Sequence, residues 1–329
     1  MSEENSQNSS DIDASDTVDA ENLNVKEENV AISEAVTENP LSLLSPHDVE
    51  VDLNHSQLTK IENLEFLEKV EVLCLRWNLI KRIENLHMLT TLRELELYDN
   101  QIQVIENLSS LTNLEVLDIS FNRIRKIENL EALDKLKKLY LCSNKISKIE
   151  NVSNLQNLEL LELGDNKLRT IENLEGLTNL KSLFLGKNKI TKLENFDSLV
   201  NLEILGMQSN RLTKIENLTN LVKLEQLYLS HNGIKTLEGL EKNINIKTLD
   251  AACNSIEKIQ NISHLTDIEE FWFNGNQISD WNDLKDLEQC KKLQTVYLEH
   301  NPIQKDANYR RKIKLALPSL IQIDATLCR

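Results

Sequence analysis

The residue types that could do chemistry form no recognisable set in this 329-residue sequence. Five cysteines include no C-x-x-C pair, and six histidines show no metal-ligand spacing. Seven glycines make no G-x-G-x-x-G or phosphate-binding frame. No Ser/His/Asp or Cys/His signature can be assembled either. We therefore expect no catalytic residue, no metal and no cofactor.

Charge and hydropathy exclude further classes. The net charge of −16 argues against direct nucleic-acid binding, because affinity for phosphate comes from Lys and Arg. No stretch of 18 apolar residues exists, so no membrane partner is predicted. The N-terminal residues lack a basic start and an apolar segment, which argues against secretion. The odd number of unpaired cysteines favours a reducing cell interior.

Asparagine is the one polar residue with regular spacing. Eleven asparagines follow one another in nine steps of 22 residues and a last step of 25. Each closes a frame of the Leu-x-x-Leu-x-Leu-x-x-Asn type, in which another apolar residue replaces leucine in some copies. An Ile-Glu-Asn-Leu signature, or a variant of it, follows. An amide can satisfy backbone groups of its own turn and of a neighbouring one, so we interpret these residues as a structural ladder. The ladder consists of Asn78, Asn100, Asn122, Asn144, Asn166, Asn188, Asn210, Asn232, Asn254, Asn276 and Asn301.

This repeat predicts the fold. The x-Leu-x-Leu-x stretch alternates with period two, which is typical of a short strand with two leucines inward. Stacking such strands makes a parallel sheet on the concave side of a solenoid. We predict an α/β solenoid, a leucine-rich-repeat horseshoe of about twelve 22-residue repeats. Its convex segments should be short 3₁₀ or irregular turns, and a helical cap should close its C-terminal end.

The two ends of the chain differ from the repeats. Residues 1–45 hold 11 acids and one base and show no period, which predicts a disordered acidic tail. The repeat array should cover residues 46–301, and residues 302–329 should form the cap, with a helix ended by Pro318. The basic run 310–314 could be a nuclear signal, but we favour the solvated face of the cap helix.

Outward strand positions lie six, four and two residues before each ladder asparagine. They make up a tenth of the chain, which would hold about 1.4 of its 14 aromatic residues by chance, and they hold six. They also carry seven carboxylates against two bases, Arg76 and Lys138. Exposed rings are favoured interface anchors, whereas the alternative is that they only stabilise the sheet. We predict a protein partner with a basic surface and apolar spots.

Longer runs of residues carry a resemblance to a known family. These runs are Leu-Tyr-Asp-Asn-Gln-Ile at 97–102, Leu-Phe-Leu-Gly-Lys-Asn-Lys-Ile-Thr-Lys at 183–192, and Met-Gln-Ser-Asn-Arg-Leu-Thr-Lys-Ile at 207–215. Over residues 46–329 the sequence resembles the leucine-rich-repeat regulatory subunit of protein phosphatase type 1, a nuclear and mitotic family. The resemblance implies phosphatase contacts, and Tyr140 stands where we expect the family to have Phe. With Tyr140 and Tyr228 from the outward row, the predicted partner-binding set is Asp118, Tyr140, Glu162, Phe184, Tyr228, Asp250, Glu270, Trp272 and Tyr297.

The resemblance also implies a function. The expected protein is a non-catalytic subunit that binds the phosphatase catalytic subunit through its concave face and controls its activity, maturation or localisation in mitosis. A further phosphatase regulator could join in a ternary complex, and the expected location is the nucleus and cytoplasm. The alternative is a generic intracellular leucine-rich-repeat scaffold, splicing- or cytoskeleton-associated, with a different partner. The third hypothesis for the function is an enzyme.

Overall fold

The computed structural model describes residues 40–328, which lie in a unit that runs from Asn39 to Arg329. Most of the predicted acidic tail lies outside these residues. Its last part does not fit the prediction of disorder, because residues 40–43 form the 3₁₀ helix η1 (Pro40–Leu43). Leu41 and Leu44 pack against the core of the first repeat. The apolar side chains at 41 and 44 therefore extend the ordered unit before the predicted boundary at residue 46.

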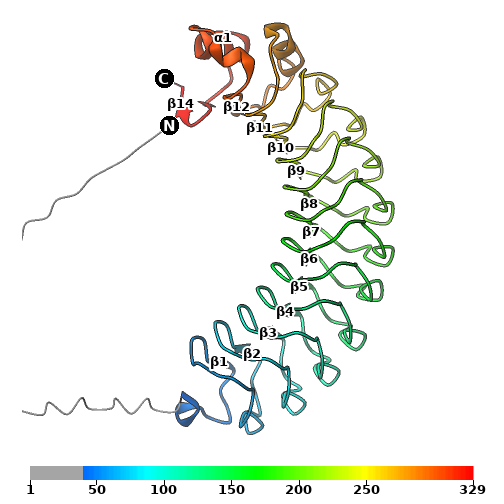
Figure 1. The fold of residues 1–329 in the computed structure, drawn as a ribbon, viewed down its shortest axis with the longest axis vertical. Coiled ribbons are helices and arrows are strands. Elements are labelled where there is room, and N and C mark those ends of the chain that lie inside the picture. The colour runs from blue at the N-terminus through cyan, green and yellow to red at the C-terminus, as the bar shows by residue number, and fades with distance from the viewer. Residues whose placement is uncertain (1–39, 329) are drawn as a thin grey trace, which may run out of the picture. The chain divides into compact units, whose positions relative to one another are not determined.

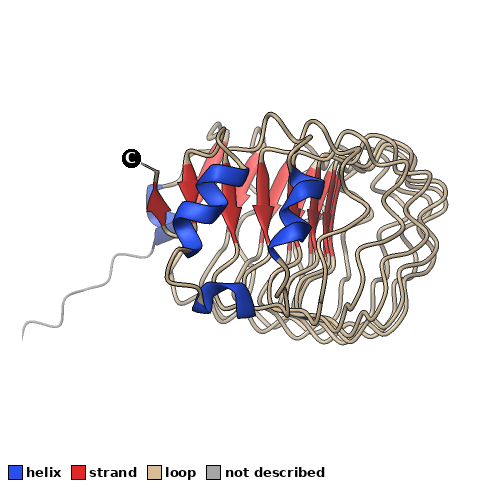
Figure 2. Cartoon of the chain, turned by 90° about the horizontal axis from the view of Figure 1, so that it is seen from above, coloured by secondary structure: helices blue, strands red, loops and turns tan. Residues whose placement is uncertain are grey.

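The described unit is built on a single sheet whose strands follow chain order. Strands β1 to β13 are parallel, and β14 pairs antiparallel with β13. Figure 1 shows the repeats following one another along an arc, and Figure 2 shows the strands side by side. The strands are β1 (Glu50–Asp52), β2 (Val72–Cys74), β3 (Glu94–Glu96), β4 (Val116–Asp118), β5 (Lys138–Tyr140), β6 (Leu160–Glu162), β7 (Ser182–Phe184), β8 (Ile204–Gly206), β9 (Gln226–Tyr228), β10 (Thr248–Asp250), β11 (Glu270–Trp272), β12 (Thr295–Tyr297), β13 (Gln322–Ile323) and β14 (Thr326–Leu327).

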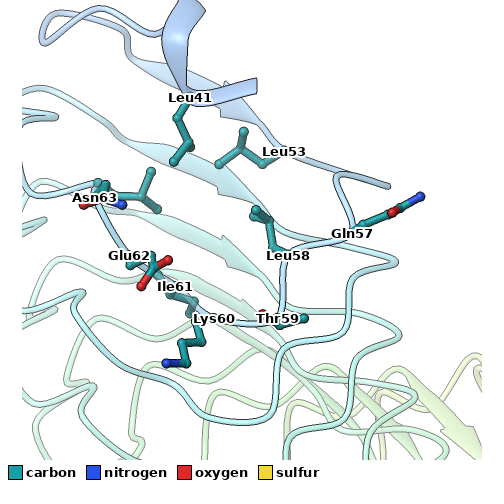
Figure 3. A pocket seen from close by; sticks show the side chains of 10 residues that line it. Leu41, Leu53, Gln57, Leu58, Thr59, Lys60, Ile61, Glu62 and Asn63 are labelled. Atoms are coloured by element: carbon teal, nitrogen blue, oxygen red, sulfur yellow. The ribbon is translucent and has the colours of Figure 1, made fainter. Parts of the chain in front are cut away.

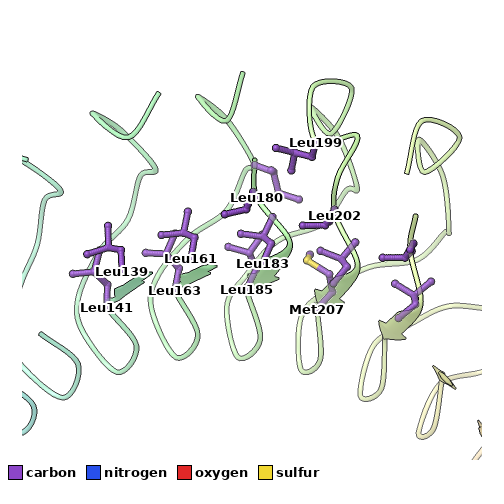
Figure 4. Packing of buried hydrophobic residues seen from close by; sticks show 14 of the residues in the cluster. Leu139, Leu141, Leu161, Leu163, Leu180, Leu183, Leu185, Leu199, Leu202 and Met207 are labelled. Atoms are coloured by element: carbon purple, nitrogen blue, oxygen red, sulfur yellow. The ribbon is translucent and has the colours of Figure 1, made fainter. Parts of the chain in front are cut away.

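Registered stacking places equivalent residues of successive repeats side by side. Leu161 pairs with Leu183, and Leu183 pairs with Leu205, each 22 residues further on. These leucines have no exposed surface, and Figure 4 shows the inward side chains of neighbouring repeats lined up in one column. The period of two in the sequence therefore sends one side of every strand into a continuous core. The twelve strands β1–β12 confirm the predicted leucine-rich-repeat solenoid.

The ladder asparagines join each repeat to the one before it. Asn166 donates from Nδ2 to the carbonyl of Leu141 in the previous repeat (2.9 Å) and to Leu163 in its own turn (3.1 Å). Its Oδ1 accepts the backbone N–H of Ile146, also in the previous repeat (2.9 Å). All eleven asparagines repeat the pattern of one accepted and at least two donated bonds.

A second asparagine row, in the Ile-Glu-Asn-Leu signature, was not predicted. Its nine members have φ between 57° and 61°, and all of them except Asn63, in the first repeat, donate to a carbonyl 24 residues earlier. Asparagine tolerates this left-handed conformation better than most residues, which explains its presence in the signature. One repeat that lacks the asparagine has Gly239 there, with φ of 72°.

The convex side and the cap agree with the predicted element types. The convex segments are turns and bends, and the last repeat has the 3₁₀ helix η2 (Trp281–Leu287). The cap contains η3 (Pro302–Lys305) and α1 (Tyr309–Ala316). Arg310 donates to the carbonyls of Ile323 and Thr326, and Lys314 donates to Leu320. Arg310 and Lys314 therefore fasten the cap rather than lying on a wholly solvated helix face, whereas Arg311 and Lys312 are exposed as predicted.

Replacing Leu183 by Ala should lower the free energy of unfolding by about 2–5 kcal/mol, because it leaves a cavity in a fully buried column. Urea denaturation followed by circular dichroism measures this change. Ser182→Ala on the same strand is the control, since Ser182 points away from the core and is only half-buried. Equal midpoints for both variants would contradict the assigned inward direction.

Asn166→Ala should destabilise the protein by about 3 kcal/mol, because several buried backbone groups lose their partners. The matched control is Asn157→Ala. Asn157 is exposed and donates only to Asp134 (2.7 Å), so water can replace it and the loss should stay below about 1 kcal/mol. Denaturation midpoints of both variants measure these losses of stability. Similar losses would show that a buried ladder asparagine stabilises the fold no more than an exposed one does.

Candidate functional site

The nine predicted partner-binding residues lie on one face, because the strands bring their outward positions together. They come from β4, β5, β6, β7, β9, β10, β11 and β12, and eight of the nine belong to the central outward row. Glu270 lies in a neighbouring row on β11. We call this surface the concave face. Whether it binds a partner remains a prediction.

Gly206 interrupts the central row in β8 for a steric reason. A Cβ added at this position would lie 2.8 Å from Cδ1 of Phe184. The ring of Phe184 therefore lies over the glycine, which gives it a flat place on the sheet. A larger residue at 206 would have to displace the ring.

Three rings form a cluster at the C-terminal part of the concave face. Trp272 lies between Tyr228 (ring centroids 6.4 Å apart) and Tyr297 (6.1 Å), in edge-to-face arrangements. Tyr228 and Trp272 are two strands apart and meet above Asp250, which lies on the strand between them. Such ring pairs stabilise one another, so the cluster holds its shape without a partner. We call these three residues the aromatic cluster.

The indole of Trp272 carries an unsatisfied group. Its Nε1 is buried and has no hydrogen-bond partner among residues 40–328. A buried donor without an acceptor costs free energy, of about 1–3 kcal/mol. An acceptor that reaches this nitrogen after a small side-chain movement would recover that cost.

The carboxylates of the central row are less exposed than the sequence suggested. Three of the four accept the backbone N–H two residues further on: Asp118 from Ser120 (2.9 Å), Glu162 from Gly164 (2.7 Å) and Asp250 from Ala252 (3.0 Å). Asp250 is only 5% exposed. These carboxylates, which stand at the predicted outward strand positions, also complete the turns after their strands.

Burial changes the proton affinity of these carboxylates. It raises the pKa of Glu162 to about 7, and the hydrogen bond from Gly164 opposes this rise. Burial also raises the pKa of Asp118 and of Asp250. A cationic side chain placed against Glu162 would favour its ionised form, so binding of such a partner would release a proton near neutral pH.

At the N-terminal part of the concave face, acids and bases neutralise one another. Arg76 forms an ion pair with Glu96, which is 9% exposed, and its guanidinium lies over the ring of Tyr98. The pKa of Glu94 is raised by its own burial and by neighbouring Glu96. Burial, with Glu96 beside it, raises the pKa of the Cys74 thiol to about 12, so this thiol stays protonated.

A second group of rings was not predicted. His55 stacks on Trp77 (4.5 Å), Trp77 meets Tyr98 (5.6 Å), and Tyr98 meets Phe121 (4.8 Å). Trp77 and Phe121 are 41% and 44% exposed. They directly precede ladder asparagines, at a left-handed position with φ of 54° and 55°. The sequence contained a signal for this group, because Trp77 and Phe121 are large rings at a position where other repeats have small or polar residues such as Asp99 and Ser143.

A cavity of about 250 Å³ lies at the N-terminal end of the described unit, beside η1. Figure 3 shows Leu41, Leu53 and Leu58 on one side of it and Lys60 and Glu62 on the other. No preceding described repeat covers this side of the first one. Its lining contains neither cysteine nor histidine, so it offers no nucleophile or metal ligand of those types.

Within residues 40–328, no helix has the length and apolarity needed to cross a membrane. The same part of the chain brings together no group of three or more His, Cys, Asp or Glu side chains that could hold a metal ion.

Comparisons with known proteins define the class. A family model described as "Leucine-rich repeat" matches residues 85–185, and one described as "Leucine Rich repeats (2 copies)" matches 178–220 and 200–242. A leucine-rich-repeat protein of Leptospira interrogans superposes with a TM-score of 0.71 and 25% identity, over 79% of this chain and 74% of that one. An internalin of Listeria monocytogenes gives 0.67 and 23%, over 85% and 87%. The chain is a leucine-rich-repeat solenoid.

The curated relatives match a short stretch of this chain. Over 52 residues the chain is 64% identical to Protein phosphatase 1 regulatory subunit 7 of Xenopus tropicalis and 58% identical to that of Homo sapiens. Over 54 residues it is 50% identical to Protein phosphatase 1 regulatory subunit SDS22 of Schizosaccharomyces pombe. Each match covers 16% of this chain and 14–16% of the relative. The predicted resemblance to this regulatory subunit is therefore confirmed. The matched stretch of 52 residues is shorter than the predicted range of residues 46–329.

Replacing Glu162 by Gln should change how stability depends on pH. The pKa of the folded carboxyl (about 7) lies above its ordinary value of 4.5, so folding favours the protonated form. Stability from this group is fully present below about pH 4.5 and is lost as the pH rises towards 7. The glutamine variant should match the parent at about pH 4.5 and exceed it by up to about 3 kcal/mol at about pH 8.

Urea denaturation at both pH values measures this difference. Glu159→Gln is the control, because Glu159 forms an ion pair with Lys181 (2.8 Å) that lowers its pKa. That variant should gain no stability at alkaline pH, since it removes an attraction. A Glu162→Gln protein without any gain would show that the carboxylate is solvated.

Proposed function

We propose that this protein is a non-catalytic regulatory subunit that binds the catalytic subunit of type 1 serine/threonine protein phosphatase. The observation that carries the proposal is the stretch of 52 residues that is 64% identical to a protein named as such a subunit. The solenoid adds an extended surface of the kind that repeat proteins use for protein partners.

The concave face is the proposed contact surface, and the aromatic cluster is its proposed anchor. Hot spots in protein interfaces are enriched in Trp and Tyr that fill desolvated pockets. The rings of Tyr228, Trp272 and Tyr297 are already packed against one another, so little side-chain freedom is lost on binding. Phe184, whose ring lies over Gly206, would add a second apolar contact.

Carboxylates around these rings give the proposed contact its charge preference. Asp118, Glu162 and Glu270 lie along the same face as the rings and would meet Lys or Arg of the phosphatase. Their positions are held in part by hydrogen bonds to their own backbone, as in Glu162. Charge pairing would then orient the partner, whereas the rings would supply most of the affinity.

The cellular setting extends the same proposal. We propose that the complex acts in the nucleus and cytoplasm, during mitosis, where it would control the activity, maturation or localisation of the phosphatase. A further phosphatase regulator would join through the catalytic subunit in a ternary complex. Imaging of the tagged chain through the cell cycle tests the location independently of binding.

Trp272→Ala should weaken binding to the purified phosphatase catalytic subunit by about 2–4 kcal/mol, because it removes the central ring of the anchor. Isothermal titration calorimetry measures the change. Stability should fall by about 1 kcal/mol, since two ring contacts are lost in the folded protein.

Trp77→Ala is the matched control, because it removes an exposed tryptophan that lies outside the predicted partner-binding set. It should bind the phosphatase like the parent. If the parent and Trp272→Ala bind the phosphatase with equal affinity, the assignment of the aromatic cluster as the anchor is wrong. If the parent does not bind at all, the phosphatase is not the partner.

A further inference from the structure

A row of basic side chains runs along the loops that leave the strands β4–β8. Each member directly follows a ladder asparagine, and its backbone N–H donates to a carbonyl of the previous repeat at 2.8 Å. This bond holds the loops of successive repeats in register, so equivalent loop residues form a row along the repeats of β4–β8, whose ribbon Figure 1 shows. The row consists of Arg123, Lys145, Lys167, Lys189 and Arg211.

The surrounding loop residues reinforce this charge. The five six-residue segments from 121–126 to 209–214 hold 12 Lys and Arg and one acid, Asp165. The composition of the chain would place about three bases and about five acids in 30 residues. We call these segments the basic band. It stands out in a chain whose net charge is −16.

Most cations of the basic band lack an ion-pair partner among residues 40–328. Of its 12 bases, only Lys192 and Lys214 have an ion-pair partner among residues 40–328, at 3.6 and 3.8 Å. The opposite arrangement occurs just before the strands. There Arg93 lies between Glu71 and Glu115, and Lys181 pairs with Glu159. The same fold can therefore neutralise stacked cations, but within residues 40–328 it does so for only two of the 12 bases of the basic band.

Folding gives no reason for this concentration of charge. The side chains of the row lie between inward positions, such as Asn144 and Ile146 around Lys145, and do not fill the core. Like charges on neighbouring repeats repel one another, which disfavours the folded state. We propose that the basic band is a docking surface for an acidic polypeptide segment, separate from the concave face.

The chemistry of the band favours a polypeptide over a nucleic acid. Proteins that bind single strands place aromatic rings between their bases, because the rings stack on nucleobases. The five segments of the basic band contain one ring, Phe121, at one end. Lys predominates over Arg, which suits single carboxylates better than bidentate recognition of phosphate or guanine. An extended segment rich in Asp and Glu could cross the stacked repeats and meet a cation on each.

A labelled poly-glutamate peptide, long enough to cross five repeats, tests the proposal in fluorescence anisotropy with the full chain. The parent should bind it, with affinity that falls as salt increases. The triple variant Lys145→Glu/Lys167→Glu/Lys189→Glu should bind at least about tenfold more weakly, because three attractions become repulsions.

The matched control is Lys60→Glu/Lys69→Glu/Lys242→Glu, which changes the net charge equally at exposed lysines outside the basic band. It should keep most of the affinity, and circular dichroism should show that both variants fold. An equal loss in both variants, or no binding by the parent, overturns the proposal. Tighter binding of a single-stranded or duplex nucleic acid than of poly-glutamate, lost in the band variant, also overturns it. Phosphatase binding should be retained in the band variant, which keeps this test apart from the proposed function.

Discussion

The hydrogen bonds of one buried asparagine per repeat are the interaction on which the structure depends. Where the chain leaves each strand, backbone groups face the core side and cannot pair with a neighbouring strand. Buried backbone groups without partners would destabilise the fold, so a short amide with two donors and an acceptor is required. Because each amide also bonds to the previous repeat, the turn of one repeat helps to stabilise its neighbour.

This arrangement separates folding from recognition. Inward leucines and ladder asparagines satisfy the core, so outward positions can vary without changing the fold. Repetition then places equivalent outward residues in rows, and each row acquires its own chemistry. Rings and carboxylates share the concave face, and ion pairs such as Lys181–Glu159 precede the strands. The cations that follow β4–β8 mostly lack an ion-pair partner among residues 40–328.

The concave face is partly organised before any partner arrives. Trp272 is held between two tyrosines, and Glu162 and Asp250 accept hydrogen bonds from their own turns. Ordering these side chains beforehand lowers the entropy lost on association. The burial that orders them also raises the pKa of Glu162, so charge on this face depends on pH near neutrality.

From the sequence alone, the repeat period determined the fold class, the strand positions, the inward leucines and the face on which the predicted binding residues lie. These follow from local spacing, since a period of two selects one side of a strand and a period of 22 stacks it. Only the tertiary structure decided how exposed each outward residue is and what it contacts. Asp250 is buried between two rings from neighbouring strands, and Trp77 stacks on His55. Ten cations of the basic band have no ion-pair partner among residues 40–328. These properties depend on side chains from different repeats meeting in space.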